Sequence, residues 1–205
     1  MSQTAQEDFW IGQFGDDYIA RNESLDLLAA NLHLFGKVAE AMEPVSSVFE
    51  VGANVGMNLR ALRQLMPQAS LTGLEINAQA CETLSKLDGV EAIHGSILDF
   101  DTTRRFDLVF TKTVLIHINP GHLNDLYAKI VELSNRYVMV CEYYNPAPVT
   151  IPYRGHTERL FKRDFAGEIM DQHGLRLIDY GFHYHRHPTF RQDDVTWFLM
   201  EKTSS

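Results

Sequence analysis

The chain alternates short apolar runs with segments of helical periodicity, and this alternation restricts the fold more than any other feature of the sequence. Apolar runs at 47–51, 71–75, 90–94, 106–110 and 136–143 are separated by segments whose apolar residues recur every three or four positions. Strands that are apolar throughout are typical of a parallel sheet that helices cover on both faces. A length of 205 residues suits one well-buried core, so we expect a single domain.

The carboxyl-terminal part of the chain breaks this alternation. Two strand-like runs, at 175–181 and 195–201, follow one another without a helical segment between them, which predicts an antiparallel hairpin at a sheet edge. The expected fold class is therefore α/β: a doubly wound, mostly parallel seven-stranded sheet with an antiparallel C-terminal hairpin. The first long helix is predicted to begin after Asn22 or Ser24 and to end before Pro44.

Charge and cysteine content argue against several functional classes. The formal net charge of -9 disfavours binding to nucleic acid through the overall field of the protein, since phosphate binding is largely electrostatic. Cys81 and Cys141 stand far apart and form no metal or disulfide pattern, which is typical of a reduced compartment. The sequence has no basic and apolar leader and no run of about 20 apolar residues. We expect a cytoplasmic protein without a membrane or nucleic-acid partner.

A glycine-containing loop follows the first strand in the stretch FEVGANVG. A dinucleotide fingerprint that started at Gly52 would need glycine at the places of Asn54 and Met57, and the lysine of a phosphate-binding loop is absent. The spacing is instead ExGxNxG, from Glu50 to Gly56, and asparagine tolerates the left-handed backbone of a tight turn. A strand-to-helix turn without a ligand is the plain alternative, in which the Glu50 carboxylate hydrogen-bonds the loop amides.

Glu75 ends the second strand, about 20 residues after this loop, where an acid can accept hydrogen bonds from both hydroxyls of a ribose. Doubly wound sheets bind ligands outside the carboxyl ends of their strands, where the strand order reverses. The loop and the acid therefore predict a ligand that carries ribose and adenine but no polyphosphate.

Together these features resemble class I S-adenosylmethionine-dependent methyltransferases, over residues 47–143. The resemblance implies S-adenosyl-L-methionine as the cofactor and S-adenosyl-L-homocysteine as its product. It implies that the loop contacts the amino-acid part and ribose of the cofactor, that Glu75 holds the ribose and that Ile76 flanks the adenine. The loop residues that the resemblance assigns to the cofactor are Glu50, Gly52, Asn54 and Gly56.

The same resemblance assigns residues after the third and fourth strands. The family often has an acid near the adenine amino group, whereas this chain reads HGSILDF, which puts Ser96 and Ile97 at the adenine and Asp99 outside the site. After the fourth strand, Lys112 or Thr113 would line the pocket that faces the methyl donor, with His117 nearby.

Two further segments, EDFWIGQFGDDYIARN at 7–22 and YYNPAPVTIPYRGHTERLFKRDFAGE at 143–168, resemble the pseudaminic acid biosynthesis-associated methylases. This bacterial group is found with genes for nine-carbon acidic sugars. The resemblance implies a small polar or acidic acceptor, a nonulosonic sugar or its precursor, methylated on oxygen or nitrogen. An amino acid, a peptide or another small metabolite is the alternative acceptor, and a non-catalytic nucleoside-binding module is a further alternative.

These resemblances imply a division of the single domain into three parts. We expect an N-terminal helical cap at 1–43, an S-adenosylmethionine-binding core at 44–142, and an acceptor-site loop with the C-terminal hairpin at 143–205. Within the cap, Tyr18 and Arg21 are predicted to reach over the cofactor and meet its carboxylate, whereas Phe9 and Phe14 have the spacing of a stripe that packs on the core.

The segment 143–165 carries four cations and two acids, a local excess of +2 in an acidic protein. Arginine forks suit the capture of a carboxylate, so Tyr143, Arg154 and Arg159 are candidate contacts to an acidic acceptor. For Lys162 and Arg163, a solvated basic face is the alternative.

Methyl transfer to a hydroxyl or ammonium group needs a base, and imidazole titrates near neutrality. The candidates are His117 and His156, with Tyr153 or Tyr143 as hydrogen-bonding partners. A packed histidine that caps the following helix is the alternative for His117.

The string HYHRH places His183, His185 and His187 on one face of an extended segment, where three imidazoles could bind zinc. A polar strand edge is the preferred interpretation, because no cysteine lies nearby, and we expect no metal. A nicotinamide-dependent oxidoreductase remains a rival enzyme class, disfavoured by the failed fingerprint. The sequence leaves the oligomeric state open.

Overall fold

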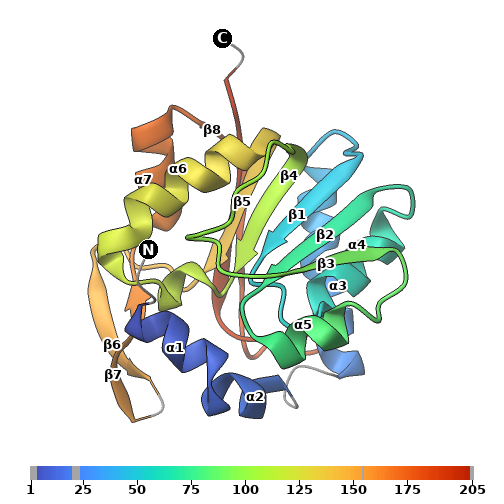
Figure 1. Ribbon diagram of the computed structural model, residues 1–205. Helices are drawn as coiled ribbons and strands as arrows, with labels where there is room; N and C mark the ends of the chain where they lie inside the picture. The colour runs from blue at the N-terminus through green and yellow to red at the C-terminus, as the bar shows by residue number, and fades with distance from the viewer. Residues whose placement is uncertain (1–3, 20–23, 154, 204–205) are drawn as a thin grey trace.

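A computed structural model of the protein describes residues 4–19, 24–153 and 155–203, apart from the side chains of residues 17–19, 156 and 157 (Figure 1). Its main sheet has seven strands in the order β3-β2-β1-β4-β5-β9-β8. These strands are β1 (Ser47–Val51), β2 (Ser70–Glu75), β3 (Val90–His94), β4 (Phe106–Lys112), β5 (Ser134–Glu142), β8 (Arg176–His183) and β9 (Val195–Glu201).

The pairing of the strands confirms the predicted fold class. The strands from β3 through β5 pair in parallel, and Val48 of β1 lies opposite Leu71 of β2 on one side and Leu108 of β4 on the other. The strand β9 then runs antiparallel to both β5 and β8, which is the predicted C-terminal hairpin. The strand order reverses at β1, because the chain moves outward to β2 and β3 and then returns to β4.

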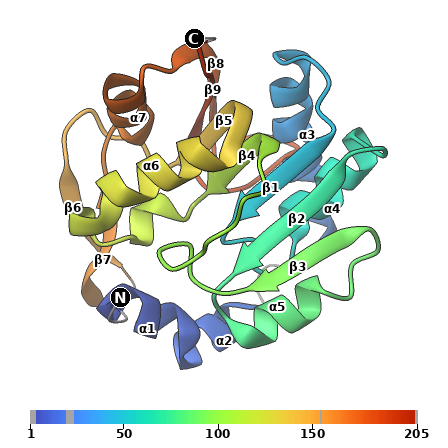
Figure 2. The same ribbon diagram turned by 45° about the horizontal axis from the view of Figure 1, so that its top comes forward.

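Helices cover both faces of this sheet, and each face has its own apolar core. The helices α3 (Leu25–Glu40), α4 (Met57–Leu65) and α5 (Ala78–Leu84) share one buried cluster with the sheet. The helices α6 (Leu123–Leu133) and α7 (Phe165–His173) share the other. Figure 2 shows α6 and α7 on one side of the sheet and α3 and α4 on the opposite side. Among the described helices, none combines the length and apolar content that crossing a bilayer requires.

Side-chain caps mark the starts of several helices. The Ser24 hydroxyl accepts the amide N–H of Leu27 at 3.1 Å and so caps α3, as one of the two predicted caps. Asn119 and Pro120 start a 3₁₀ turn, η2 (Pro120–His122), rather than the first turn of α6. A similar turn, η1 (Leu115–His117), precedes it directly after β4.

Two short helices within the expected N-terminal cap, and a hairpin that the sequence did not predict, lie at the carboxyl ends of the parallel strands. The helices α1 (Ala5–Ile11) and α2 (Gln13–Ile19) lie below the arrowheads of β1 and β4 in Figure 1. The segment expected as an ordered loop instead forms a two-stranded antiparallel sheet, β6 (Val149–Tyr153) and β7 (His156–Lys162). The side chain of Gln6 donates to the Glu158 carbonyl at 3.3 Å, which joins α1 to this hairpin.

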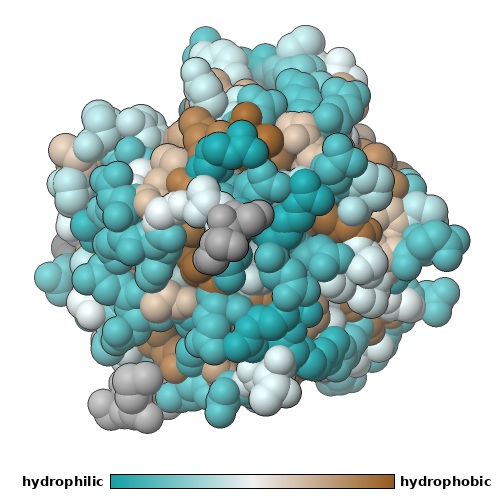
Figure 3. All heavy atoms as spheres, turned by 90° about the horizontal axis from the view of Figure 1, so that it is seen from above, coloured by the Kyte–Doolittle hydropathy of each residue, from teal (hydrophilic) through white to brown (hydrophobic). Residues whose placement is uncertain are grey.

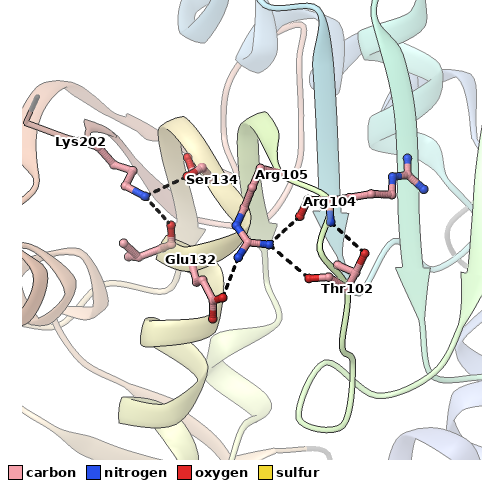
Figure 4. Close-up of polar contacts among 7 residues, drawn as sticks. Thr102, Arg104, Arg105, Glu132, Ser134 and Lys202 are labelled. Carbon is pink, nitrogen blue, oxygen red and sulfur yellow. Dashed lines mark hydrogen bonds and ion pairs between the residues drawn. The ribbon is translucent and has the colours of Figure 1, made fainter.

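Polar contacts of charged side chains, with one another and with the backbone, cover the amino-terminal edge of the sheet. Arg105 donates to the Glu132 carboxylate at 2.7 Å, and Lys202 donates to the Ser134 carbonyl at 2.9 Å (Figure 4). Figure 3, which views the molecule from above, shows a mainly hydrophilic surface with only small hydrophobic areas. An exposed ion pair such as Arg105–Glu132 contributes about 0–1 kcal/mol to stability. We therefore interpret this edge of the sheet as a solvated surface.

Candidate active site

A cavity of about 410 Å³ lies at the carboxyl ends of β1, β2 and β4. This is the point where the strand order reverses, which is where doubly wound sheets bind ligands. Pockets for small molecules and cofactors have volumes of roughly 300–1,000 Å³, so a nucleoside-sized ligand fits here. The predicted site residues that line the cavity are Gly52, Asn54, Glu75, Ile76, Ser96, Ile97, Lys112, Thr113 and His117.

The loop after β1 has the left-handed backbone that its sequence predicted. The φ angles of Gly52, Asn54 and Gly56 are 71°, 49° and 81°. A Cβ atom at Gly52 would lie 2.6 Å from a methyl group of Val114, and one at Gly56 would lie 2.5 Å from a methyl group of Leu87. The backbone therefore approaches the protein's own side chains closely, and these glycines are required by the fold before any ligand is considered.

Glu75 fastens this loop to the end of β2. Its carboxylate oxygens accept the backbone N–H groups of Asn54 and Asn77, each at 2.7 Å, and the side chain is 6% exposed. Burial raises the pKa of Glu75, although both of these N–H groups favour its ionised form. A carboxylate has about four acceptor positions, so the group retains acceptor capacity toward the cavity.

Glu50 lies outside the cavity lining and is fully buried, in contrast to the predicted contact with a cofactor. The side-chain amide of Asn58 donates to its Oε1 at 2.6 Å, and burial raises the pKa of Glu50 to about 8. Since Asn58 itself lines the cavity, the Glu50 carboxylate holds a side chain of the cavity wall, and its predicted contact with a cofactor stays a prediction. Gly56 is likewise outside the lining and serves as the N-cap of α4.

The wall after β3 combines apolar side chains with a carboxylate from another part of the chain. The Ser96 hydroxyl donates to the Glu7 carboxylate, whose second oxygen accepts the backbone N–H of Thr4 at 2.7 Å. Glu7 lines the cavity beside Ile97, whereas Asp99 is exposed and lies outside it, as the sequence predicted. The sequence signal of Glu7 was only its capping-box spacing from Thr4, which marks a helix start and not a site.

The ring of His117 has one defined tautomer. Its Nδ1 lies 2.6 Å from the Arg159 carbonyl oxygen, which can only accept, so Nδ1 carries the proton and Nε2 is left unprotonated. Burial lowers the pKa of His117 to about 4, and the rings of Trp10 and Tyr153 pack at centroid distances of 4.8 and 5.1 Å. Asn119 caps the turn that follows, so the alternative in which His117 caps a helix is wrong, although the ring is packed as that alternative predicted.

Glu142, which the sequence did not single out, shapes the segment that carries His117. Its Oε1 accepts the backbone N–H groups of Val114 and Leu115 at 3.0 and 3.1 Å, and Oε2 accepts that of Ile116 at 3.4 Å. Burial raises the pKa of this carboxyl to about 7. The end of β5 thus folds the turn after β4 and places the imidazole at the cavity.

Part of the chain is similar in sequence to a known protein family. Residues 48–136 match the family model described as a methyltransferase domain. No curated protein matched the sequence. The matched residues run from β1 to the start of β5.

Solved methyltransferase structures share the fold at low sequence identity. Magnesium protoporphyrin IX methyltransferase from Synechocystis PCC 6803, with bound S-adenosylhomocysteine, has a TM-score of 0.73 and 14% identity over 98% of this chain and 100% of that one. The 1,6-didemethyltoxoflavin-N1-methyltransferase of Burkholderia thailandensis has a TM-score of 0.70 and 13% identity over 97% and 87%. Coclaurine N-methyltransferase has a TM-score of 0.76 and 10% identity over 98% and 84%. The finer resemblance to pseudaminic acid-associated methylases stays a prediction.

Within this methyltransferase fold, three predicted acceptor or catalytic residues are not among those that line the cavity. The Tyr143 hydroxyl donates to Asp193 at 2.7 Å, and it is Asp193 that lines the cavity. Tyr153 packs against the ring of His117. The guanidinium of Arg159 lies 5.5 Å from the centroid of the Phe9 ring.

Some candidates fall outside the described part of the chain. Arg21 and Arg154 are not described, and for Tyr18 and His156 only the backbone is, so their predicted roles stay predictions. The backbone of His156 lies in β7, paired with Tyr153 of β6.

The histidine string does not stay extended, and the expectation that its three rings share a face is wrong. A turn, in which the His187 N–H donates to the Tyr184 carbonyl, sends His185 to an exposed pair with Asp194 at 2.8 Å. His183 and His187 instead lie against His33 of α3, with ring centroids at 6.1 and 5.2 Å from it. Within the described ranges, no group of three or more histidine, cysteine or acidic residues could hold a metal.

Proposed function

We propose that the protein transfers a methyl group from S-adenosylmethionine to a small polar or acidic acceptor, with a nonulosonic sugar or its precursor as the first candidate. The observation that carries the proposal is the Gly52–Asn54 turn, held by the Glu75 carboxylate, at the cavity where the strand order reverses. The methyltransferase domain match at 48–136 supports the same conclusion. An S-adenosylhomocysteine ligand in the structural neighbours supports S-adenosylmethionine as the cofactor.

The lining fits this cofactor. The free acceptor positions of Glu75 suit two ribose hydroxyls, and the side chains of Ile76 and Ile97 offer apolar surface for the faces of adenine. Glu7 is the acid nearest to Ser96 and so takes the place that the family gives to an acid after the third strand. When bound, the cofactor would supply a methyl group on a positively charged sulfur.

The charge of the described lining suits a cation. Three acids, Glu7, Glu75 and Asp193, line the cavity with a single lysine, Lys112. A site whose charged residues are mostly acidic attracts cations and raises their local concentration. An acidic group of the acceptor would therefore lie away from this lining, toward the cationic side chains of β7.

The residues of the chain supply proton removal and alignment. The unprotonated Nε2 of His117 accepts the proton that a hydroxyl or ammonium acceptor loses, and the Arg159 carbonyl keeps that tautomer. A pKa lowered to about 4 leaves the imidazole neutral at physiological pH, so Nε2 is free to accept a hydrogen bond from the acceptor, but burial also makes it a weak base. A positioned base typically contributes ~10²- to 10⁴-fold to the rate, and alignment contributes more. His156, the first residue of β7 in the β6–β7 hairpin, remains the second candidate for the base.

The wall between α1 and the hairpin is the proposed acceptor side. Trp10 lines the cavity and touches His117, while Phe14 contacts Tyr153 with ring centroids 6.1 Å apart. This arrangement supports the division into an N-terminal cap, a cofactor core and an acceptor region from residue 143 onward. An amino acid, a peptide or another metabolite stays the alternative acceptor, since the neighbours include a porphyrin, a toxoflavin and a glycopeptide methyltransferase.

Titration calorimetry tests the proposal. S-adenosylhomocysteine should bind to the protein and NAD should not, and Glu75→Ala should lose binding while the exposed Glu82→Ala keeps it. Equal affinity for the two ligands, or an affinity for S-adenosylhomocysteine that Glu75→Ala does not lower, would contradict the assignment. Release of the methyl group onto a panel of acidic sugars, nucleotide sugars, amino acids and peptides then separates an enzyme from a binding module.

A further inference from the structure

We infer that Asn31 and Gln192 form the subsite that holds the α-amino-acid end of the methyl donor. The inference rests on the proposed function and adds to it two residues that neither the sequence motifs nor the resemblances single out. It starts from two side-chain amides that line the cavity and have no hydrogen-bond partner among the described residues.

Asn31 brings a buried amide to the cavity from α3. It sits in the interior of α3, one turn after Leu27, which also lines the cavity, and it is 1% exposed. Both its amide nitrogen and its amide oxygen are buried without a partner in the described structure. Asparagine is a poor helix former, and buried polar groups are almost always hydrogen-bonded. A side chain that violates both rules at the wall of a cavity is explained by a ligand that is bound there.

Gln192 repeats this pattern from a distant part of the chain. It lies between β8 and β9 and lines the same cavity, and both of its amide atoms are buried without a partner among the described residues. A ring stack ties this segment to α3, since Phe190 lies on His33 with centroids 4.3 Å apart and planes at 16°. His33 stands two residues from Asn31 and outside the cavity lining, so the stack fastens the segment that carries Gln192 to the helix that carries Asn31.

The chemistry of this side matches a zwitterion. An amide offers one donor group and one acceptor, which correspond to a carboxylate and an ammonium group. Lys112 and Asp193 line the same cavity and supply full charges of both signs. The Tyr143 hydroxyl, which donates to Asp193 at 2.7 Å, fixes that carboxylate in place. Since the adenosine part is assigned to Glu75 and its neighbours, the remaining polar lining is available to the amino-acid end.

The test compares two ligands by calorimetry. S-adenosylhomocysteine carries the amino-acid end, whereas 5′-methylthioadenosine shares the nucleoside and the thioether but lacks it. Asn31→Leu keeps the number and branching of the side-chain heavy atoms and removes both polar atoms. We expect it to weaken S-adenosylhomocysteine by roughly 10- to 100-fold, the size of a lost hydrogen bond to a charged group, and 5′-methylthioadenosine by less than about twofold.

Two further variants keep the result interpretable. Gln192→Met should give the same selective loss from a loop position, so the test does not depend on the folding of one helix variant. Gln79→Leu makes an equivalent change on the exposed surface of α5 and should alter neither affinity. Without ligand, Asn31→Leu should melt at the same or a higher temperature, because it removes an unsatisfied buried amide.

Each outcome has one meaning. Selective loss of S-adenosylhomocysteine in both variants supports the inference. Equal losses for the two ligands, or no loss, would overturn it and leave the proposed function standing. If the unaltered protein binds neither ligand, the proposed function fails together with this inference.

Discussion

Substitution of Gly52 tests whether the loop after β1 is constrained by the fold itself. Gly52→Ala must place an L-residue at a φ of 71°, and its Cβ would lie 2.6 Å from a methyl group of Val114. The left-handed backbone costs about 1–2 kcal/mol, and an extra carbon in a packed site costs about 1–3 kcal/mol. Val114 is β-branched and therefore stiff, so it cannot move aside freely. We expect Gly52→Ala to lower the free energy of unfolding by about 2–5 kcal/mol.

A double-mutant cycle separates the two contributions. Val114→Ala alone should cost about 1–2 kcal/mol, since it removes two half-buried carbons. In the double variant the clash is absent and the backbone strain remains, so the two effects should not add. The expected coupling is about 1–3 kcal/mol in favour of the double variant.

Urea unfolding, followed by circular dichroism, measures all four proteins under one condition. Additive effects would refute the close approach of Val114 to the loop. A Gly52→Ala variant that is as stable as the unaltered protein would refute the left-handed turn as well.

Three further predictions concern ionisable groups. Burial lowers the pKa of His117 from 6.5 to about 4, so between these pH values the unfolded chain binds more protons than the folded one. The free energy of unfolding should therefore fall by about 3 kcal/mol as the pH drops from 6.5 to 4. His117→Phe should remove that slope in pH-dependent urea titrations, whereas His122→Phe, at a half-buried position outside the cavity lining, should keep it. Burial raises the pKa of Glu142 to about 7, so its stabilising contribution is fully present below pH 4.5 and is lost as the pH rises through 7. The free energy of unfolding should fall by about 3 kcal/mol over this range, and Glu142→Gln should remove that fall. His185→Ala breaks an exposed pair and should change the melting temperature by less than about 2 °C, and a larger shift would contradict its surface role.

Several parts of the fold followed from local sequence. The strands β1, β2 and β4 are buried along most of their length, so each appears in the sequence as a mainly apolar run without strict alternation. The glycine turn was recognisable because a left-handed backbone restricts the residue type at Gly52 and Asn54. Glu75 was recognisable because its role depends only on its place at the end of a strand.

Other features depend on contacts between distant segments and leave no local signal. Asn31 and Gln192 face the same cavity only because the fold brings α3 next to the segment before β9. Glu7 reaches the wall after β3 across 89 positions of sequence. The hairpin β6–β7 was missed because its prolines and exposed residues are typical of a loop, and β6 pairs only with β7.

A crystal structure of the protein with S-adenosylhomocysteine tests the central claim most directly. The account requires the ribose hydroxyls within hydrogen-bonding distance of the Glu75 carboxylate and the glycine turn against the ligand. A ligand bound at another surface, or a ribose that points away from Glu75 inside this cavity, would contradict it.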